Sequence, residues 1–194
     1  MNTLPLFHTG FEIIESPDLK HGRKNADFGQ GFYLSPNKEF CRRWARTQKG
    51  RRTFLNSYGL DLHDLNVREF ARDEEWFDYI FSNRSFQPDQ IIADVIIGPI
   101  ANDTIYDTWG IITSGLLKKE IAFPLLCLGK SYIQAVIKTE KAKAALHFKG
   151  AEELSEEDVL AYQKTLKEEE QHFQEQFAAL LEKLTAAKTE HSTY

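Results

Sequence analysis

The sequence has few of the features by which a function is usually recognised. It contains two cysteines, Cys41 and Cys127, among 194 residues, too few and too widely spaced for a disulfide framework or a zinc site. Its six histidines have no ligand-like spacing either, so we expect no metal. No apolar run approaches the roughly 20 residues of a membrane span, and the N-terminus lacks the pattern of a secretory signal. We therefore expect a soluble, cytoplasmic protein with no membrane contact.

Two common nucleotide-binding motifs are also missing. Gly29-Gln30-Gly31 begins like a Rossmann fingerprint, but the third glycine position falls on Leu34. A Walker loop is excluded because no Gly-Lys-Ser/Thr follows. Taken alone, these glycines mark a turn that tolerates positive φ.

The charge divides the chain near residue 150. The net charge is −5, but residues 151–194 hold 11 acidic and 4 basic side chains, which gives the C-terminal part −7 and leaves +2 for residues 1–150. The hydrophobic content of 42% is enough for one sizeable core. We expect one domain over residues 1–150 and an acidic segment over residues 151–194.

Short apolar, β-branched or aromatic runs predict at least six strands, over residues 4–8, 31–35, 53–60, 93–100, 132–137 and 144–148. Helical spacing predicts helices over residues 38–48, 74–83 and 105–119. These elements do not alternate regularly as in a doubly wound sheet. The sequence therefore favours an α+β fold with antiparallel sheets.

A long amphipathic helix is predicted in the C-terminal part. Ser155 followed by Asp158 resembles a capping box. Apolar residues then recur every seven positions, at Val159, Leu166, Phe173 and Leu180. This stripe can pack back onto the body of the protein, or it can bind a partner protein or a second copy of the chain.

Three segments of the N-terminal part carry the functional signal. His8 ends the first apolar strand, Asp27–Tyr33 reads Asp-Phe-Gly-Gln-Gly-Phe-Tyr, and Trp44 lies eleven residues beyond Tyr33. Each has an ordinary structural explanation when taken alone. Their combination resembles the ADP-ribosyltransferase superfamily, in its His-Tyr-Glu branch.

The resemblance is closer to a bacterial family of uncharacterised domain-of-unknown-function proteins and covers roughly residues 5–149. It rests on residues 6–9, 27–33 and 132–137, with further similar segments at residues 76–78, 83–84 and 97–103. It implies a split antiparallel β-sandwich with flanking helices, and NAD as the co-substrate.

The resemblance also implies a set of NAD-binding residues. His8 would hydrogen-bond the adenosine-side ribose, and the backbone of Thr9, where relatives have glycine, would meet the nicotinamide carboxamide. Tyr33 and Trp44 would stack on the two faces of the nicotinamide ring. Cys41 falls where related enzymes often carry a small hydroxyl residue that bonds the carboxamide.

Two further residues complete the expected NAD-binding set. Arg23 precedes the central motif and can pair with the pyrophosphate, although a solvated surface arginine is the ordinary alternative. Gly31 belongs to the central motif itself.

The third catalytic position is Gln134, where family enzymes use glutamate. Its amide can hold a ribose hydroxyl but supplies no full charge and no base. Three interpretations remain: slow transfer by oxocarbenium capture, a carboxylate recruited from elsewhere such as Glu140 or Asp103, or an NAD-binding pseudoenzyme. The resemblance implies that the closer bacterial relatives carry glutamine there too, which makes Gln134 a family trait.

The sequence thus leads to a hypothesis and its alternatives. The hypothesis is a toxin-like or regulatory bacterial mono-ADP-ribosyltransferase, in which His8, Tyr33 and Gln134 act on NAD and an unknown macromolecule is the acceptor. The alternatives are NAD glycohydrolysis and a non-catalytic NAD- or nucleotide-binding module that acts through a partner protein. A third is nucleic acid binding through six cations between Arg42 and Arg52.

Overall fold

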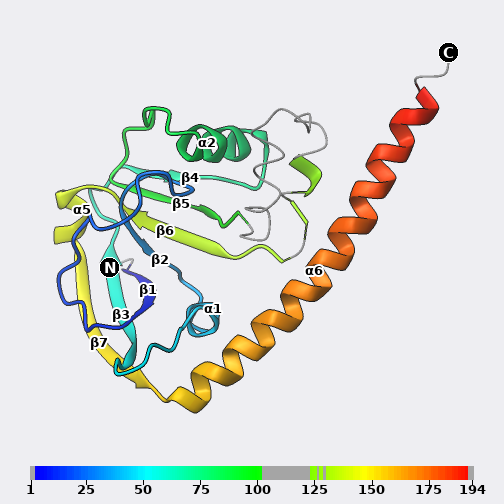
Figure 1. Cartoon of the computed structure of the whole chain (residues 1–194). Helices are drawn as coiled ribbons and strands as arrows, with labels where there is room; N and C mark the ends of the chain where they lie inside the picture. Colours follow the sequence, from blue (N-terminus) through cyan, green and yellow to red (C-terminus); the bar gives the residue numbers. More distant parts are fainter. Residues whose placement is uncertain (1–2, 102–122, 126, 129, 192–194) are drawn as a thin grey trace. The chain divides into compact units, whose positions relative to one another are not determined.

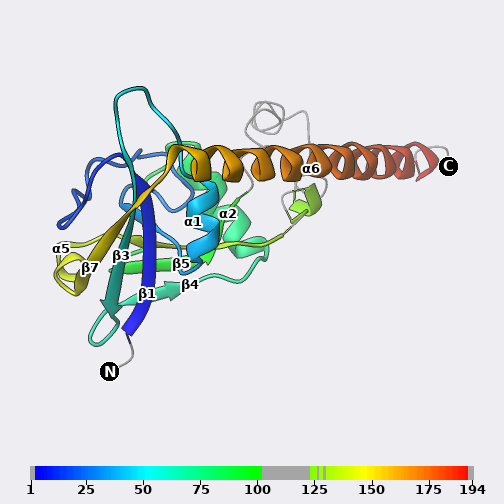
Figure 2. The ribbon, with the colours of Figure 1, turned by 90° about the horizontal axis from the view of Figure 1, so that it is seen from below.

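Two β-sheets organise the computed structural model, which describes residues 3–101, 123–125, 127–128 and 130–191. The first is a three-stranded antiparallel sheet in the order β1-β3-β7, formed by β1 (Thr3–Gly10), β3 (Thr53–Asp61) and β7 (Leu146–Leu154). These three strands run side by side in Figures 1 and 2. Because β3 is central and paired on both sides, most of its residues are buried, and Leu55 and Leu60 are fully so.

The second sheet has four strands in the order β2-β6-β5-β4. They are β2 (Phe32–Leu34), β6 (Ile133–Ile137), β5 (Val95–Pro99) and β4 (Val67–Glu69). Its pairs are antiparallel except β4 with β5, which is parallel. The predicted α+β class with mainly antiparallel sheets is confirmed.

A hydrophobic core is formed by side chains from both sheets. Because side chains alternate between the faces of a strand, Phe32 and Leu34 of β2 join Ala135 and Ile137 of β6 in this core. The first sheet contributes Leu6, Tyr58 and Leu60 to the same cluster. The alternate residues, Tyr33 on β2 and Gln134 and Val136 on β6, therefore lie on the opposite face of the four-stranded sheet.

Three short helices of this region begin at side-chain caps, which satisfy backbone N–H groups of the first turn. They are α1 (Lys38–Arg43), α2 (Glu74–Arg84) and α5 (Glu140–Ala144), capped by Asn37, Asp73 and Thr139 respectively. Helix α2 lies against the four-stranded sheet (Figure 1), where the indole N–H of Trp76 donates to the Pro99 carbonyl at 2.8 Å.

The predicted elements agree with the structure more closely in kind than in extent. Strands occur in all six predicted regions, but β4 was not predicted, and β7 continues past Gly150 to Leu154. The helix predicted over 38–48 ends at Arg43, because the N–H groups of Trp44 and Ala45 bond carbonyls three residues back and tighten the last turn. The helix predicted over 105–119 lies outside the described residues.

The predicted C-terminal helix is present as α6 (Glu156–His191). Ser155 is its cap, accepting the Asp158 N–H at 3.1 Å and donating its hydroxyl to the Asp158 carboxylate at 2.7 Å. Val159 is fully buried with Cys41, Ala45, Leu55 and Leu154. The first turns of α6 therefore pack onto the sheet region, as one of the two interpretations of the stripe predicted.

The described residues form two compact units. One comprises residues 3–100 and 132–165, which include both sheets, and the other includes residues 166–191 of α6. In the second unit Phe173 is buried, and its ring lies 6.0 Å from that of Phe177. Among the helices of the described residues, none combines the length and apolar character needed to cross a membrane.

Candidate functional site

Ser35 joins the two sheets at the point where the motif residues meet. Its backbone exchanges two hydrogen bonds with Phe7 of β1, at 2.8 and 2.9 Å. Its buried hydroxyl donates to the Ile133 carbonyl of β6 at 2.7 Å. The strands that carry His8, Tyr33 and Gln134 are thus held together around one serine. Ser35 was not predicted as a site residue, although it directly follows the aromatic strand.

His8 is held to the central motif through its imidazole. Its Nδ1 lies 2.8 Å from the carbonyl oxygen of Tyr33, and because a carbonyl only accepts, Nδ1 carries the proton and Nε2 is left as an acceptor. Burial lowers the pKa of His8, and the bond to Tyr33 only partly offsets this effect. The ring also packs against Phe32, with 4.7 Å between ring centroids. His8 is therefore neutral at pH 7 with a fixed acceptor nitrogen.

Thr9 and Cys41 connect β1 to α1. The Thr9 hydroxyl donates to the Cys41 carbonyl at 3.1 Å, and the Cys41 thiol donates to the Phe7 carbonyl at 3.3 Å. Burial raises the pKa of Cys41 to about 12. The thiol thus remains protonated and braces the strand, and it is unsuited to act as a nucleophile.

The backbone of Thr9 points toward the junction of the sheets. The N–H and C=O groups of Phe7 face Ser35, and in an antiparallel strand the backbone groups of residues i and i+2 point to the same side. The N–H and C=O groups of Thr9 therefore point to the same edge of β1 as those of Phe7, two residues past the pair that Phe7 forms with Ser35. One backbone donor and one backbone acceptor of Thr9 therefore lie at this edge.

Tyr33 closes the turn that precedes it. Its hydroxyl accepts the Phe28 N–H at 2.9 Å and donates to the Gly29 carbonyl at 2.7 Å. The ring is half-buried and held at both ends, by its backbone in β2 and by its hydroxyl. Tyr33 is therefore a preorganised aromatic surface.

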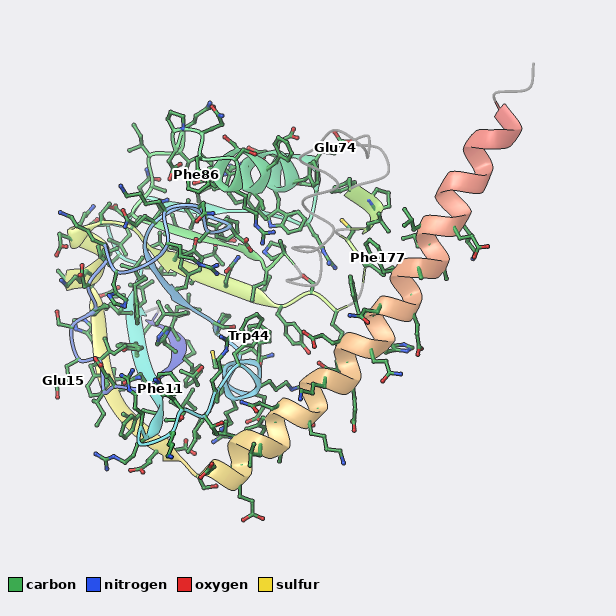
Figure 3. All side chains as sticks on the ribbon, viewed as in Figure 1. Phe11, Glu15, Trp44, Glu74, Phe86 and Phe177 are labelled. Carbon is green, nitrogen blue, oxygen red and sulfur yellow. The ribbon has the colours of Figure 1, made fainter. Side chains whose placement is uncertain are left out.

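Trp44 directly follows α1, as labelled in Figure 3. Its ring lies 5.8 Å from that of Phe40 between centroids. The indole Nε1 is shielded from solvent, and within the described part of the chain it has no hydrogen-bond acceptor. A buried donor left unsatisfied costs about 1–3 kcal/mol, so a ligand that supplies an acceptor there would relieve this cost.

The turn formed by Asp27, Phe28 and Gly29 is fixed by three different side chains. Their successive carbonyls accept from Asn83 at 3.1 Å, from Lys138 at 2.6 Å and from the Tyr33 hydroxyl. Gly29 has φ +73°, the left-handed region in which glycine carries no steric cost. The central motif is therefore a rigid turn packed between α2 and β6.

A buried polar cluster of Asp27, Arg84 and Gln134 lies beneath this turn. The Arg84 Nε donates to Oδ1 of Asp27 at 2.8 Å, and Arg84 Nη2 donates to the same oxygen. The Gln134 amide nitrogen donates to Oδ2 of Asp27 at 3.0 Å. All three residues are between 6% and 7% exposed. Their burial makes these charge-assisted bonds strong and the geometry fixed.

Asp27 and Arg84 were not predicted as site residues. Both stood within segments that carry the family resemblance, so the signal was present in the sequence. Glu140, one of the two carboxylates considered as a substitute for the missing glutamate, is exposed in the first turn of α5 and pairs with Lys143 at 3.4 Å. Asp103, the other, lies outside the described residues. The carboxylate in contact with Gln134 is that of Asp27.

Gly31 and Arg23 differ in their surroundings. A Cβ on Gly31 would lie 2.6 Å from the Ile137 carbonyl oxygen and from Cγ1 of Val136, so the backbone of residue 31 packs directly against β6. Gly22 fits equally tightly against the Gly31 carbonyl, with a Cβ distance of 2.5 Å. The side chain of Arg23, next to Gly22, is exposed.

At least three of the six cations in the basic segment form ion pairs. Arg42 pairs with Glu39 and Glu152 at 2.6 and 2.9 Å. Arg51 pairs with Glu12, and Arg52 pairs with Glu153, at 3.0 and 3.1 Å. Three of its six cations thus face acidic side chains, which reduces the field available to attract a nucleic acid.

A family model described as "Protein of unknown function (DUF3990)" matches residues 4–148. The chain belongs to this family. The matched range includes β1 from Leu4 onward, the central motif, the buried cluster and β6, so the site lies within the DUF3990 region. No curated protein and no solved structure matches the chain.

Proposed function

We propose that this DUF3990 protein is an NAD-dependent mono-ADP-ribosyltransferase that modifies a macromolecular acceptor. The observation that carries the proposal is the junction at Ser35, which brings together the three strands bearing His8, Tyr33 and Gln134. These are the positions at which the sequence resembles the His-Tyr-Glu ADP-ribosyltransferases.

The geometry around His8 and Thr9 suits the two ends of NAD. A neutral histidine with Nε2 as acceptor can take a hydrogen bond from a ribose hydroxyl. A Cβ added to Gly10 would lie 3.5 Å from Nε2, so glycine keeps that side of the ring accessible to a sugar. The neighbouring Thr9 N–H and C=O, at one strand edge, match the acceptor and donor of a carboxamide.

Tyr33 and Trp44 are the aromatic surfaces for the nicotinamide ring. Offset stacking contributes about 0.5–1.5 kcal/mol per aromatic pair beyond burial, and a ring fixed in advance loses little entropy when it binds. The Tyr33 hydroxyl supplies that fixation. The indole N–H of Trp44 adds a donor that the described part of the protein leaves without an acceptor.

In the proposed reaction, the bond between the ribose C1′ and the nicotinamide nitrogen breaks. Its electron pair leaves with nicotinamide, and a lone pair of the acceptor forms the new bond to C1′ while the acceptor proton is released to solvent water. Positive charge develops on the ribose in the transition state. The oxygen of the Gln134 amide can hold a ribose hydroxyl close to that charge, but it cannot take the acceptor proton. We therefore expect slow transfer.

A second candidate, NAD hydrolysis or binding without transfer, is favoured by this same neutral amide. An enzyme lacking a catalytic base typically loses about 10²–10⁴-fold in rate. Water then competes with any weak acceptor for the oxocarbenium-like ribose, which gives hydrolysis. A protein in which both transfer and hydrolysis are negligible would bind NAD as a sensor and act through a partner protein.

A pair of measurements tests the proposal. NAD is added to the purified protein and the unfolding temperature is recorded, since a ligand that binds only the native state stabilises it by mass action. Adenine-labelled NAD is then incubated with the protein and a cell lysate. Wild type should show both a thermal shift and labelled macromolecules.

The controls use paired variants. His8→Ala should abolish the shift and the labelling, whereas His63→Ala, which removes an exposed histidine, should leave both unchanged. A shift with release of nicotinamide but without labelling would favour hydrolysis. A thermal shift with neither product would favour the binding module. Absence of any thermal shift would reject transfer, hydrolysis and the binding module alike.

A further inference from the structure

We propose that Asp27 is the positioning residue for Gln134: held by Arg84, it fixes the Gln134 amide so that the amide oxygen, and not the nitrogen, is presented to the NAD ribose. This inference rests on the proposed function and assigns to the buried cluster a part in its chemistry.

The two carboxylate oxygens of Asp27 accept from different residues. Oδ1 receives both hydrogen bonds from Arg84, and Oδ2 receives the Gln134 Nε2–H at 3.0 Å. A carboxylate can only accept, so the amide of Gln134 must turn its nitrogen toward Asp27. Its oxygen then faces the opposite direction. The Asp27–Arg84 ion pair does not itself need this third bond, since Arg84 uses the other oxygen.

The orientation matters because the two ends of an amide are nearly the same size. Without a fixed partner, Gln134 would populate both orientations, and one of them would direct N–H groups at a developing positive charge. In a buried site, an oriented acceptor costs no reorganisation when the reaction occurs. Fixing the orientation therefore favours the transition state over the ground state.

Asp27 also explains why residue 134 is glutamine here. A glutamate at this position would bring a second carboxylate to hydrogen-bond distance of Oδ2. Two carboxylates so close cannot both be ionised, and the pKa of one is strongly raised. The Asp27 charge would then disfavour the ionised form of that glutamate. An amide avoids this repulsion while keeping an oxygen acceptor.

Asp27→Asn and Gln134→Glu test the inference as single variants and together. In Asp27→Asn the fixed acceptor is lost, and we expect the kcat for nicotinamide release to fall about 10²-fold, the cost of a small misplacement of a reacting group. The KM for NAD should change little, because Gln134 acts at the bond that breaks. Gln134→Glu should show a new dependence of kcat on pH, since its carboxyl pairs with Asp27.

The double variant, Asp27→Asn with Gln134→Glu, exchanges donor and acceptor. The new amide at position 27 would donate its N–H to the new carboxylate at position 134, which restores the hydrogen bond. The negative charge then lies on residue 134 of β6 instead of on residue 27. We expect a kcat at or above that of wild type and loss of the new pH dependence. A matched control, Asp94→Asn, removes a carboxylate bonded to Thr139 and Asn66, and should leave kcat unchanged.

A structural readout covers the case in which variants fold poorly. In wild type, the Gln134 side-chain amide protons should exchange slowly with solvent by NMR, because one of them is buried against Asp27. Rapid exchange would overturn the inference without any variant. So would an Asp27→Asn protein with the kcat of wild type, or a double variant no better than the poorer single one. If wild type neither binds nor cleaves NAD, it is the proposed function that fails, and the inference fails with it.

Discussion

Asp27 and Gln134 share a buried hydrogen bond of 3.0 Å although 107 residues separate them along the chain. This bond joins the central motif to β6, the strand that carries the proposed third catalytic residue. Arg84, 57 residues from Asp27, completes the cluster from the C-terminal end of α2. The segments that resemble ADP-ribosyltransferases are thus coupled physically as well as in sequence.

The buried ion pair makes a strong prediction for stability. Asp27→Ala leaves the Arg84 charge, 6% exposed, without this carboxylate. Breaking a buried pair by removing one partner typically costs about 3–5 kcal/mol. We expect a loss of that size in the free energy of unfolding, measured by urea denaturation.

The matched control for this prediction is Arg52→Ala, which breaks the exposed Arg52–Glu153 pair. Exposed pairs contribute at most about 1 kcal/mol. Equal losses in the two variants would show that the Asp27–Arg84 pair is not buried as described.

Gly31 should tolerate no side chain. In Gly31→Ala the new methyl would meet the Ile137 carbonyl oxygen and Val136 Cγ1 at 2.6 Å, and at least the backbone oxygen cannot move without disturbing β6. Overpacking of this kind costs about 1–3 kcal/mol. The control is Gly10→Ala, whose methyl makes its nearest contact at 3.5 Å, and which should unfold close to the wild-type urea midpoint. A similar urea midpoint for the two variants would contradict the packing of Gly31 on β6.

His8 should make stability depend on pH. Burial holds the pKa of folded His8 below its ordinary value of 6.5, so the unfolded chain binds a proton that the folded protein does not. Stability is then fully present above pH 6.5 and declines as the pH falls toward the folded pKa. The urea midpoint of wild type should drop over this range.

In His8→Asn that part of the drop should disappear, while the His63→Asn control should retain it. NAD binding should weaken only as the pH falls to the folded pKa of His8 and below it, because a protonated Nε2 is no longer an acceptor. A His8→Asn variant whose urea midpoint falls with pH as steeply as that of wild type would contradict the assignment of a neutral, buried imidazole.

Two substitutions of Tyr33 should distinguish its structural role from its role in NAD binding. Tyr33→Phe removes the hydroxyl that bonds the backbone of Phe28 and Gly29, and leaving those groups unsatisfied should cost about 1–3 kcal/mol in the free energy of unfolding. The ring remains, so the thermal shift caused by NAD should largely persist. Tyr33→Leu should lose the shift as well. A full shift in Tyr33→Leu would show that the ring does not contact the ligand.

The strands could be predicted because each contains a short run of apolar, β-branched or aromatic residues, and such local runs indicate burial. The cap of α6 at Ser155 was readable for the same reason, since its bonds span three residues. The short strand β4 was missed because only one of its three residues, Val67, is apolar, whereas the equally short β2 reads Phe-Tyr-Leu. The end of α1 was misplaced because it depends on a tightened last turn that helical spacing does not reveal.

Individual residues of the site could be predicted from the sequence, but the contacts between them could not. His8, Tyr33 and Gln134 were chosen through a family resemblance, and their strands do meet at Ser35. The bond between Asp27 and Gln134 could not be read from spacing, because strand pairing and helix packing bring the two residues together. Glu140 was considered as the recruited carboxylate, whereas the carboxylate that touches Gln134 comes from the central motif.

NAD-dependent transfer is tested by incubating the protein with adenine-labelled NAD and a cell lysate, and by measuring nicotinamide release together with label on macromolecules. We expect slow release and labelling by wild type, both lost in His8→Ala and kept in His63→Ala. Intact NAD after prolonged incubation, with no NAD-dependent change in the unfolding temperature, would contradict this expectation.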